Sequence, residues 1–175
     1  MPFAFLAAGG DGHFDALLLA LVATIAGTKL LGEYPDQRAA AVADPGLVPN
    51  TIEEVLRFEP PGPHIARYVA KDVELHGQTV PAGSAMLMIV GSANRDPERF
   101  VDPDRFDIRR NTAGHLTFGY GAHFCLGAAL ARLEGRVVLD EMLKRWPEWE
   151  VDLDGAHLAP TSTVRGYETM PIRLP

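Results

Sequence analysis

Apolar residues recur at helical spacing in three parts of the chain. Residues 1–32 are rich in Ala, Leu and Ile, and residues 35–43 form a short helical pattern that starts at Pro-Asp. Residues 128–143 combine helical spacing with good helix formers. Trp-Pro at 146–147 ends this last pattern, because proline cannot continue a helix interior. The spacing therefore predicts three helices.

A fourth helix is predicted to begin at Asn50. Asparagine is a preferred N-cap residue, and Glu53 three positions later completes a typical helix start. Within this helix Glu54 and Arg57 are three residues apart, so both side chains lie on one face and can pair. Such pairs are common on solvated helices, so the spacing alone indicates no function.

Short strands are predicted in two regions. Residues 65–70 alternate, residues 73–75 lead into a His-Gly turn, and a Pro-Ala-Gly turn precedes the apolar run 85–90. Residues 151–175 contain further short strands separated by turns at glycines. The pattern predicts a mainly α protein with small β-sheets (α+β), forming a single domain over residues 1–175.

Composition and charge exclude several function classes. The chain has 175 residues, of which 47% are hydrophobic and 22% charged, as expected for a soluble globular domain with a real core. The net charge of -7 argues against non-specific nucleic-acid binding. The longest apolar stretch, residues 16–27, is too short to span a bilayer. One cysteine permits no internal disulfide, so we expect a cytoplasmic protein. From the charge and the short apolar stretch, we expect no nucleic-acid or membrane partner.

The single cysteine, Cys125, lies in the glycine-rich segment 118–127 (Phe-Gly-Tyr-Gly-Ala-His-Phe-Cys-Leu-Gly). The segment leads into a predicted helix, whose amino end favours a thiolate over a thiol. Its glycines, Gly119, Gly121 and Gly127, permit tight turns and the close approach of a flat ligand. One cysteine cannot build the usual structural zinc site or an iron–sulfur cluster, whereas it suits axial ligation of haem iron. The alternative is a buried cysteine in a glycine-rich turn.

Residues 118–127 match every fixed position of the pattern Phe-Gly-x-Gly-x-His-x-Cys-x-Gly. In this segment the chain resembles the haem-binding loop of the cytochrome P-450 family, of the soluble bacterial type. Members are generally more than twice as long, so the resemblance covers the C-terminal part of their fold. It implies haem b ligated by Cys125, with residues that bind the cofactor at Arg67, Phe118, Gly119, His123, Cys125 and Gly127.

The resemblance also implies a reaction and partners. A haem-thiolate monooxygenase inserts one oxygen atom of O2 into a small organic substrate, with electrons from a ferredoxin or flavodoxin and its reductase. The predicted helix 128–143 and the residues after it carry a basic side that suits an acidic partner: Arg132, Arg136, Lys144 and Arg145. The alternative is a truncated or non-catalytic relative that binds haem or activates a partner enzyme.

Two cationic residues are assigned to the haem propionates by the resemblance. Arg67 matches a propionate-binding arginine, for which a solvated strand charge is the alternative. His123 lies two residues before Cys125, a spacing that without the resemblance would suggest metal chelation.

The resemblance further implies a structural triad of Glu54, Arg57 and Arg105, with Arg99 as the alternative third member. One carboxylate between two guanidinium groups can fix a helix to an irregular loop.

The distal side of the site is expected in residues 8–13. Residues 8–11 (Ala-Gly-Gly-Asp) match the first half of the family's distal motif, whereas Gly-His at 12–13 replaces its two threonines. Asp11 is therefore the candidate catalytic residue of a proton path. A loop between two helices is the alternative interpretation of the same polar break.

Overall fold

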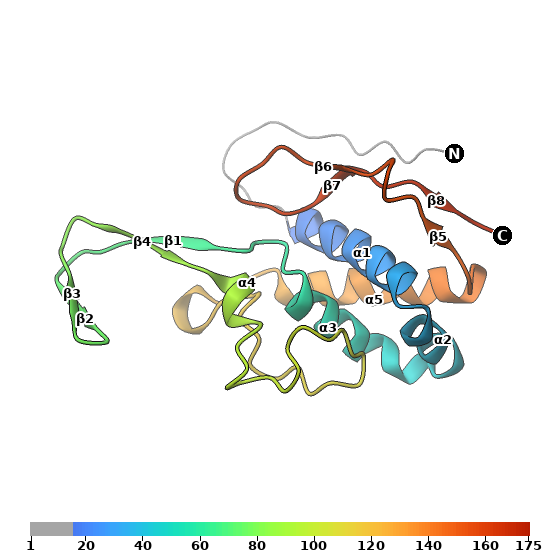
Figure 1. The fold of residues 1–175 in the computed structure, drawn as a ribbon, viewed down its shortest axis with the longest axis horizontal. Coiled ribbons are helices and arrows are strands. Elements are labelled where there is room, and N and C mark those ends of the chain that lie inside the picture. The colour runs from blue at the N-terminus through green and yellow to red at the C-terminus, as the bar shows by residue number, and fades with distance from the viewer. Residues whose placement is uncertain (1–15) are drawn as a thin grey trace.

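The computed structural model describes residues 16–175 of the chain (Figure 1). The helices are α1 (Ala16–Glu33), α2 (Pro35–Ala43), α3 (Val48–Phe58), α4 (Val90–Ala93) and α5 (Ala128–Arg145), with 3-10 turns η1 (Pro45–Leu47) and η2 (Gly121–His123). The strands are β1 (Ile65–Tyr68), β2 (Val73–Leu75), β3 (Gln78–Val80), β4 (Ala85–Met88), β5 (Glu150–Val151), β6 (His157–Leu158), β7 (Tyr167–Thr169) and β8 (Ile172–Arg173). The prediction of a mainly α protein with small sheets is confirmed.

Every described sheet is a pair of antiparallel strands. The pairs are β1 with β4, β2 with β3, β5 with β8 and β6 with β7. The first two pairs form an arm that projects from the helical body, and the last two lie beside α1 (Figure 1). The apolar run predicted as a strand over 85–90 ends at Met88, and Val90 instead begins α4.

The core lies between α1, α3 and α5, the three helices that carry most of the buried apolar side chains. Leu30 and Leu31 of α1 are almost completely buried, as are Ile52 and Val55 of α3. Gly135 of α5 allows a close approach, since a Cβ there would lie 3.2 Å from Cδ1 of Ile52. Helices α3 and α5 are therefore closely packed on each other.

Helix α3 begins three residues earlier than the sequence indicated, since its N-cap is Leu47 and not Asn50. It starts at Val48, directly after the 3-10 turn η1, and Pro49 occupies its first turn, a position that favours proline. The Asn50 side chain does not cap the helix, because its Nδ2 donates to the carbonyl oxygens of Ile108 (2.7 Å) and Arg110 (3.0 Å). The prediction of Asn50 as N-cap is wrong, and its amide connects α3 to a distant loop instead.

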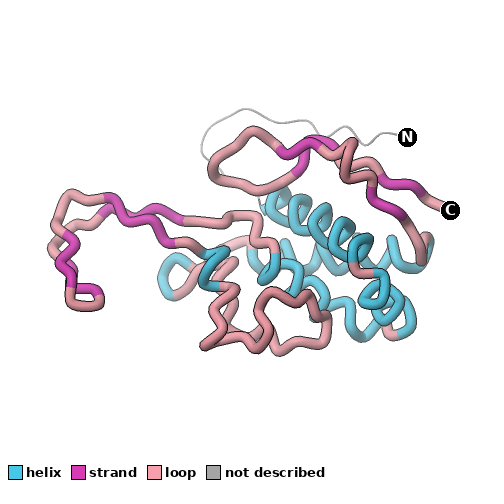
Figure 2. The backbone as a smooth tube through the Cα atoms, in the orientation of Figure 1, coloured by secondary structure: helices cyan, strands magenta, loops and turns pink. Residues whose placement is uncertain are grey.

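A long irregular segment connects α4 to α5 and passes along α3 (Figure 2). Asn94 joins the two ends of this segment: its Oδ1 accepts from the Leu116 amide (2.7 Å) and its Nδ2 donates to Thr117 Oγ1 (2.9 Å). Thr117 Oγ1 in turn donates to the Leu56 carbonyl of α3 (2.7 Å). Because Asn94 is fully buried, these bonds fix the course of the chain just before the cysteine loop.

The C-terminal strands are attached to the body through Trp149. The indole is 3% exposed, and its Nε1 donates to the Thr28 carbonyl of α1 at 3.0 Å. The Arg38 guanidinium lies over the ring, 4.7 Å from its centroid.

None of the helices in residues 16–175 combines the length and the apolar character that crossing a membrane requires.

Candidate functional site

The cysteine loop, residues 118–127, is a closed turn at the amino end of α5. The Cys125 amide donates to the Phe118 carbonyl at 2.8 Å, and the Phe124 amide donates to the Gly121 carbonyl at 3.0 Å. Gly119 and Gly121 have φ values of 73° and 67°, a region that side chains other than glycine rarely adopt. These bonds place Cys125 three residues before the start of α5. The amino end of a helix favours an anion.

Gly127 differs from the other two glycines of the loop. Its φ is -83°, an ordinary value, so the backbone does not require glycine there. The expectation that all three glycines permit unusual turns therefore holds for Gly119 and Gly121 and is wrong for Gly127.

The surroundings of the Cys125 thiol fit a flat apolar cofactor. Cys125 is free and half-buried, with Phe118 packed into the core behind it at 5% exposure. Tyr120 and Phe124 of the same loop are 87% and 53% exposed, so two aromatic rings of the loop are open to solvent. Residues 16–175 contain no group of three His, Cys, Asp or Glu that could hold a metal ion by itself. The single thiol suits a metal that brings its other ligands, as haem iron does.

The Glu54 and Arg57 side chains form a buried, two-pronged ion pair on α3. Arg57 Nε lies 2.7 Å from Glu54 Oε2, and Arg57 Nη2 lies 2.8 Å from Glu54 Oε1, with neither side chain exposed. Arg57 Nη1 also donates to the backbone carbonyls of Asn94 (2.8 Å) and Pro103 (2.9 Å). The pair therefore connects α3 to the irregular segment that precedes the cysteine loop.

The third member of the triad is Arg110, so the prediction of Arg105 is wrong. Arg110 Nε lies 3.2 Å from Glu54 Oε1, whereas the Arg105 side chain is exposed and only its carbonyl oxygen joins the network. Phe106 is buried in the core, which turns the preceding side chain toward solvent. The alternative member, Arg99, donates instead to the Ala113 carbonyl at 2.9 Å.

A second ionic cluster, not predicted from the sequence, lies beside the cysteine loop. Glu53 accepts from Arg132 Nε (2.6 Å) and Nη2 (3.0 Å), and its Oε2 lies 3.0 Å from His115 Nε2. Burial raises the pKa of Glu53, but the hydrogen bonds from His115 and Arg132 and their charges outweigh it and lower this pKa from 4.5 to about 2. These partners lie 62 and 79 residues from Glu53 along the chain, so no local pattern could have indicated them.

In residues 16–175, no hydrogen bond or ion pair joins the side chains of the two predicted propionate ligands, Arg67 and His123, to each other. Arg67 lies on β1, where its Nη1 donates to the neighbouring Ala66 carbonyl at 3.0 Å. His123 is exposed at the end of η2, within the cysteine loop. Their role toward a cofactor therefore stays a prediction. Asp11 lies outside the described residues, and its catalytic role stays a prediction as well.

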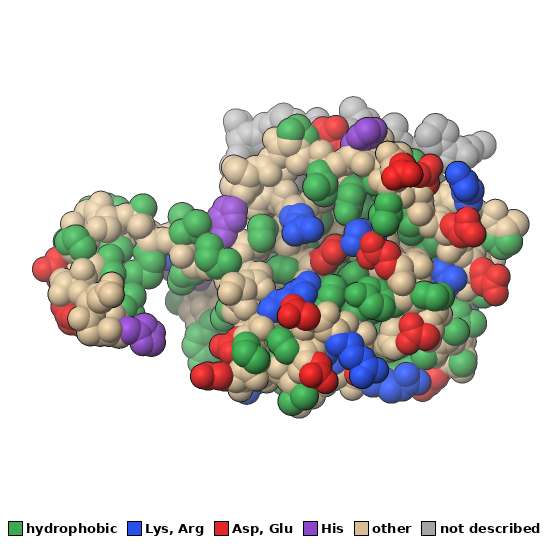
Figure 3. All heavy atoms as spheres, in the orientation of Figure 1, with side chains coloured by type: hydrophobic (Ala, Val, Ile, Leu, Met, Phe, Trp, Pro, Cys, Tyr) green, Lys and Arg blue, Asp and Glu red, His purple; other side chains and the backbone are tan. Residues whose placement is uncertain are grey.

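The basic side predicted for α5 is largely compensated by acidic neighbours. Arg132 pairs with Glu53, Lys144 with Asp140, and Arg145 with Glu141 at 2.8 Å. On the face shown in Figure 3, acidic and basic side chains are likewise mixed. The positive potential that α5 offers to an acidic partner is therefore weaker than the sequence suggested.

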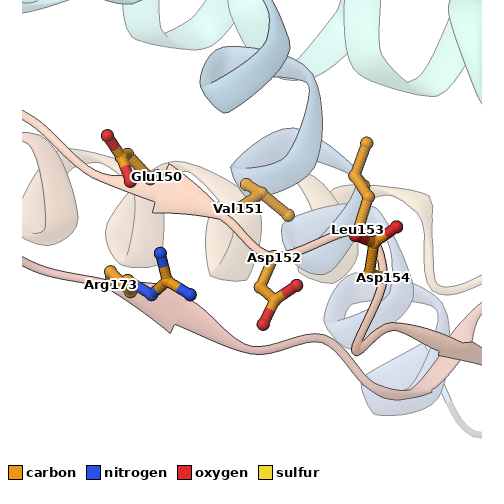
Figure 4. Close-up of a pocket in the computed structure, with 6 residues that line it drawn as sticks. All are labelled: Glu150, Val151, Asp152, Leu153, Asp154 and Arg173. Carbon is orange, nitrogen blue, oxygen red and sulfur yellow. The ribbon is translucent and has the colours of Figure 1, made fainter.

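A hollow of about 370 Å³ lies at the other end of α5, where the chain turns into the C-terminal strands (Figure 4). It is lined by Glu150, Val151, Asp152, Leu153, Asp154 and Arg173. Cys125 precedes α5 and this hollow follows it, and an 18-residue helix is about 27 Å long. The hollow is therefore separate from the cysteine loop.

The sequence model of the family described as "Cytochrome P450" matches residues 37–163. This chain belongs to the cytochrome P450 family. Cytochrome P450 monooxygenase PikC of Streptomyces venezuelae is 45% identical over 150 residues, a stretch that covers 84% of this chain and 36% of PikC. The 6-deoxyerythronolide B hydroxylase of Saccharopolyspora erythraea is 43% identical over 150 residues, covering 85% of this chain and 37% of that enzyme.

Solved P450 structures show that the fold is that of the family. Cytochrome P450 CYP109Q5 from Chondromyces apiculatus superposes with a TM-score of 0.85 at 43% identity, covering 89% of this chain and 40% of that structure. The P450 heme domain of Tepidiphilus thermophilus gives a TM-score of 0.85 at 34% identity, covering 89% of this chain and 38% of that one. The prediction of part of a P450 fold is confirmed. The chain spans little more than a third of the length of the curated relatives it matches.

Proposed function

We propose that this chain is the haem-binding part of a P450 monooxygenase, with Cys125 as the axial ligand of haem b. The observation that carries the proposal is the closed loop that holds one free thiol at the amino end of α5. Haem supplies dioxygen activation when it is bound, and thiolate ligation favours cleavage of the O–O bond. In the overall reaction one oxygen atom enters an organic substrate, and two electrons and two protons reduce the other to water.

The residues of this chain bind and orient the cofactor in this proposal. Cys125 ligates the iron, and Phe118 supports the loop from the core side. Arg67 and His123 neutralise the propionates, and Asp11 contributes to the proton path. The ion pairs of Glu54 hold the irregular segment against α3, and hence keep the loop in place.

The proposed partners are a small organic substrate, O2, and a ferredoxin or flavodoxin with its reductase, in the cytoplasm. Relatives of similar identity are named for different substrates: one is the 6-deoxyerythronolide B hydroxylase at 43%, and another is a vitamin D(3) 25-hydroxylase of Pseudonocardia autotrophica at 41%. The stretch shared with these relatives therefore does not specify the substrate.

A carbon monoxide difference spectrum of the reduced, haem-loaded chain tests the proposal. We expect the red-shifted Soret band that is typical of thiolate ligation, and we expect Cys125→Ala to abolish it. Leu158→Ala is the matched control, because Leu158 is exposed on β6, outside the cysteine loop. A red-shifted band that persists in Cys125→Ala would contradict the assignment.

A haem protein that binds and activates a partner enzyme is the second candidate. Leu130, Leu133 and Val137 of α5 are 47–55% exposed at helical spacing, which forms an apolar stripe. On the same helix Glu134 Oε2 is buried with no hydrogen-bond partner among the described residues. The test is to add the chain to a full-length P450: an activator raises its turnover, and Leu133→Glu removes the effect.

A further inference from the structure

Glu53 connects three segments that meet at the cysteine loop. It lies on α3, and its carboxylate binds Arg132 of α5 through two hydrogen bonds of 2.6 and 3.0 Å. The same carboxylate lies 3.0 Å from Nε2 of His115, which precedes the loop and whose side chain is 6% exposed. Charge-assisted, two-pronged bonds of this kind fix the orientation of a guanidinium plane.

The fixed guanidinium of Arg132 lies over the ring of Phe118. Its Cζ is 4.5 Å from the ring centroid, within the range of a cation–π interaction. The His115 ring lies 6.1 Å from the same phenyl ring at an angle of 54°. Phe118 is therefore contacted by two of the three members of the cluster, and both are held by Glu53.

Phe118 is the residue whose carbonyl accepts the hydrogen bond from the Cys125 amide, at 2.8 Å. A displacement of Phe118 therefore displaces the backbone that carries the thiol. We propose that Arg132, held by Glu53, is a positioning residue that fixes Phe118 and through it the Cys125 thiolate. The proposal rests on the function proposed above and assigns Arg132 a role inside the molecule in place of partner binding.

The cluster differs from the Glu54 network in what it can affect. Arg57 is fully buried and contacts the irregular segment, whereas the Arg132 side chain is 33% exposed and contacts the loop itself. Loss of Arg132 therefore disturbs the loop more than the stability of the fold. In its absence the thiolate is less well held, and part of the bound haem loses thiolate ligation on reduction.

The test uses Arg132→Lys, which keeps the charge but loses the planar, two-pronged contact, and Glu53→Ala, which releases Arg132. The matched control is Arg136→Lys, one turn further along α5 and exposed. In the haem-loaded chain, reduced and bound to carbon monoxide, a fraction of the haem shows the unshifted Soret band in place of the thiolate band. We expect this fraction to be several-fold larger in both cluster variants than in the wild type. We expect the control to match the wild type.

A haem-free readout separates this proposal from the proposed function. The chain has one cysteine, so the alkylation rate of the apoprotein by iodoacetamide reports on Cys125 alone. We expect several-fold faster alkylation in Arg132→Lys and Glu53→Ala and no change in Arg136→Lys. If the wild type gives no thiolate band, the proposed function fails, whereas the alkylation rates still decide the role of the cluster.

An exchanged pair distinguishes positioning from mere stabilisation. Glu53→Arg combined with Arg132→Glu restores the ion pair but places a carboxylate over Phe118 in place of the guanidinium. His115 loses its carboxylate partner in this exchange, so we expect the double variant to regain part of the thermal stability lost in Glu53→Ala while the thiolate band stays reduced. Recovery of both, or unchanged spectra and alkylation rates in the two single cluster variants, would overturn the proposal.

Discussion

Glu54 and Arg57 form an ion pair in which neither side chain reaches solvent, with nitrogen–oxygen distances of 2.7 and 2.8 Å. Removing Arg57 leaves the buried Glu54 carboxylate with Arg110 as its one remaining ionic partner among the described residues, and breaking a buried pair typically costs about 3–5 kcal/mol. We therefore expect Arg57→Ala to lower the free energy of unfolding by this amount, or to abolish soluble expression. Urea denaturation followed by circular dichroism measures the change.

The exposed pair of Arg145 with Glu141 supplies the control for this experiment. Its side chains are 65% and 48% exposed, and exposed pairs contribute roughly 0–1 kcal/mol. Arg145→Ala should therefore leave the denaturation midpoint almost unchanged. A loss of only a few tenths of a kcal/mol in Arg57→Ala would show that the buried pair does not form.

Arg110 and Arg105 provide a second matched comparison. The Arg110 side chain is 9% exposed, lies 3.2 Å from Glu54 and donates to the carbonyls of Asp102 and Arg105 at 2.9 Å. Hydrogen bonds of charged groups contribute about 1.5–3 kcal/mol, so Arg110→Ala should lower the free energy of unfolding by at least that much. Arg105→Ala removes an exposed side chain and should change it by about 0.5 kcal/mol or less. Equal losses in the two variants would contradict the placement of Arg110 at Glu54.

The lowered pKa of Glu53 predicts a dependence of stability on pH. A carboxyl group whose folded pKa lies below its unfolded value contributes stability that is fully present above the unfolded pKa. For Glu53, with values of 4.5 and about 2, that stability is lost as the pH falls from about 5 toward 2. Allowing for solvent screening of this half-buried group, we expect a contribution of about 1–2 kcal/mol.

Denaturation between pH 2 and pH 7 measures the Glu53 contribution. Glu53→Gln should be less stable than the wild type at pH 7 and should approach it at the acid end of the range. Glu98→Gln, at an exposed position, is the control and should follow the wild-type curve. Parallel curves for Glu53→Gln and the wild type would show that Glu53 does not contribute through its charge.

We expect the chain alone to couple electron consumption poorly to product formation. The chain spans little more than a third of the length of the curated relatives it matches, so most of the segments that would keep the distal site dry lie outside the shared stretch. Gly-His at positions 12–13 also replaces the two threonines of the family's distal motif. With redox partners and a panel of apolar substrates, consumed reductant should exceed product, with hydrogen peroxide as the main outcome. Tight coupling on any substrate would show that this expectation is wrong.

Local signals in the sequence predicted α1, α2, α3 and α5 but not the short helix α4. They also predicted the Glu54–Arg57 pair, because both residues lie on one turn of α3. The cysteine loop could also be predicted, since its glycines, carbonyls and amides interact within ten residues. The start of α3 was misplaced, because the Asn50 amide does not cap the helix. It binds the carbonyls of Ile108 and Arg110, which lie 58 and 60 residues away along the chain.

The remaining parts of the site depend on contacts that are distant in the sequence. Arg110 reaches Glu54 only because Phe106 and Ile108 are buried in the core and set the course of the irregular segment. Arg132 was interpreted as a surface charge, because nothing near it in the sequence indicates Glu53, 79 residues earlier. In each case tertiary packing selected one of several arginines, and a pattern of spacing could not make that selection.

The arm that carries Arg67 has a thermodynamic consequence. It consists of the two-stranded sheets β1–β4 and β2–β3, which project from the helical body (Figure 1). Isolated two-stranded sheets are marginally stable, so the backbone amides of the arm should exchange with deuterium faster than those of α3. A ligand that binds Arg67 must first restrict this motion, and part of its binding free energy offsets the lost conformational entropy. The affinity of the chain for such a ligand therefore depends on the stiffness of a hairpin as well as on the atoms that touch it.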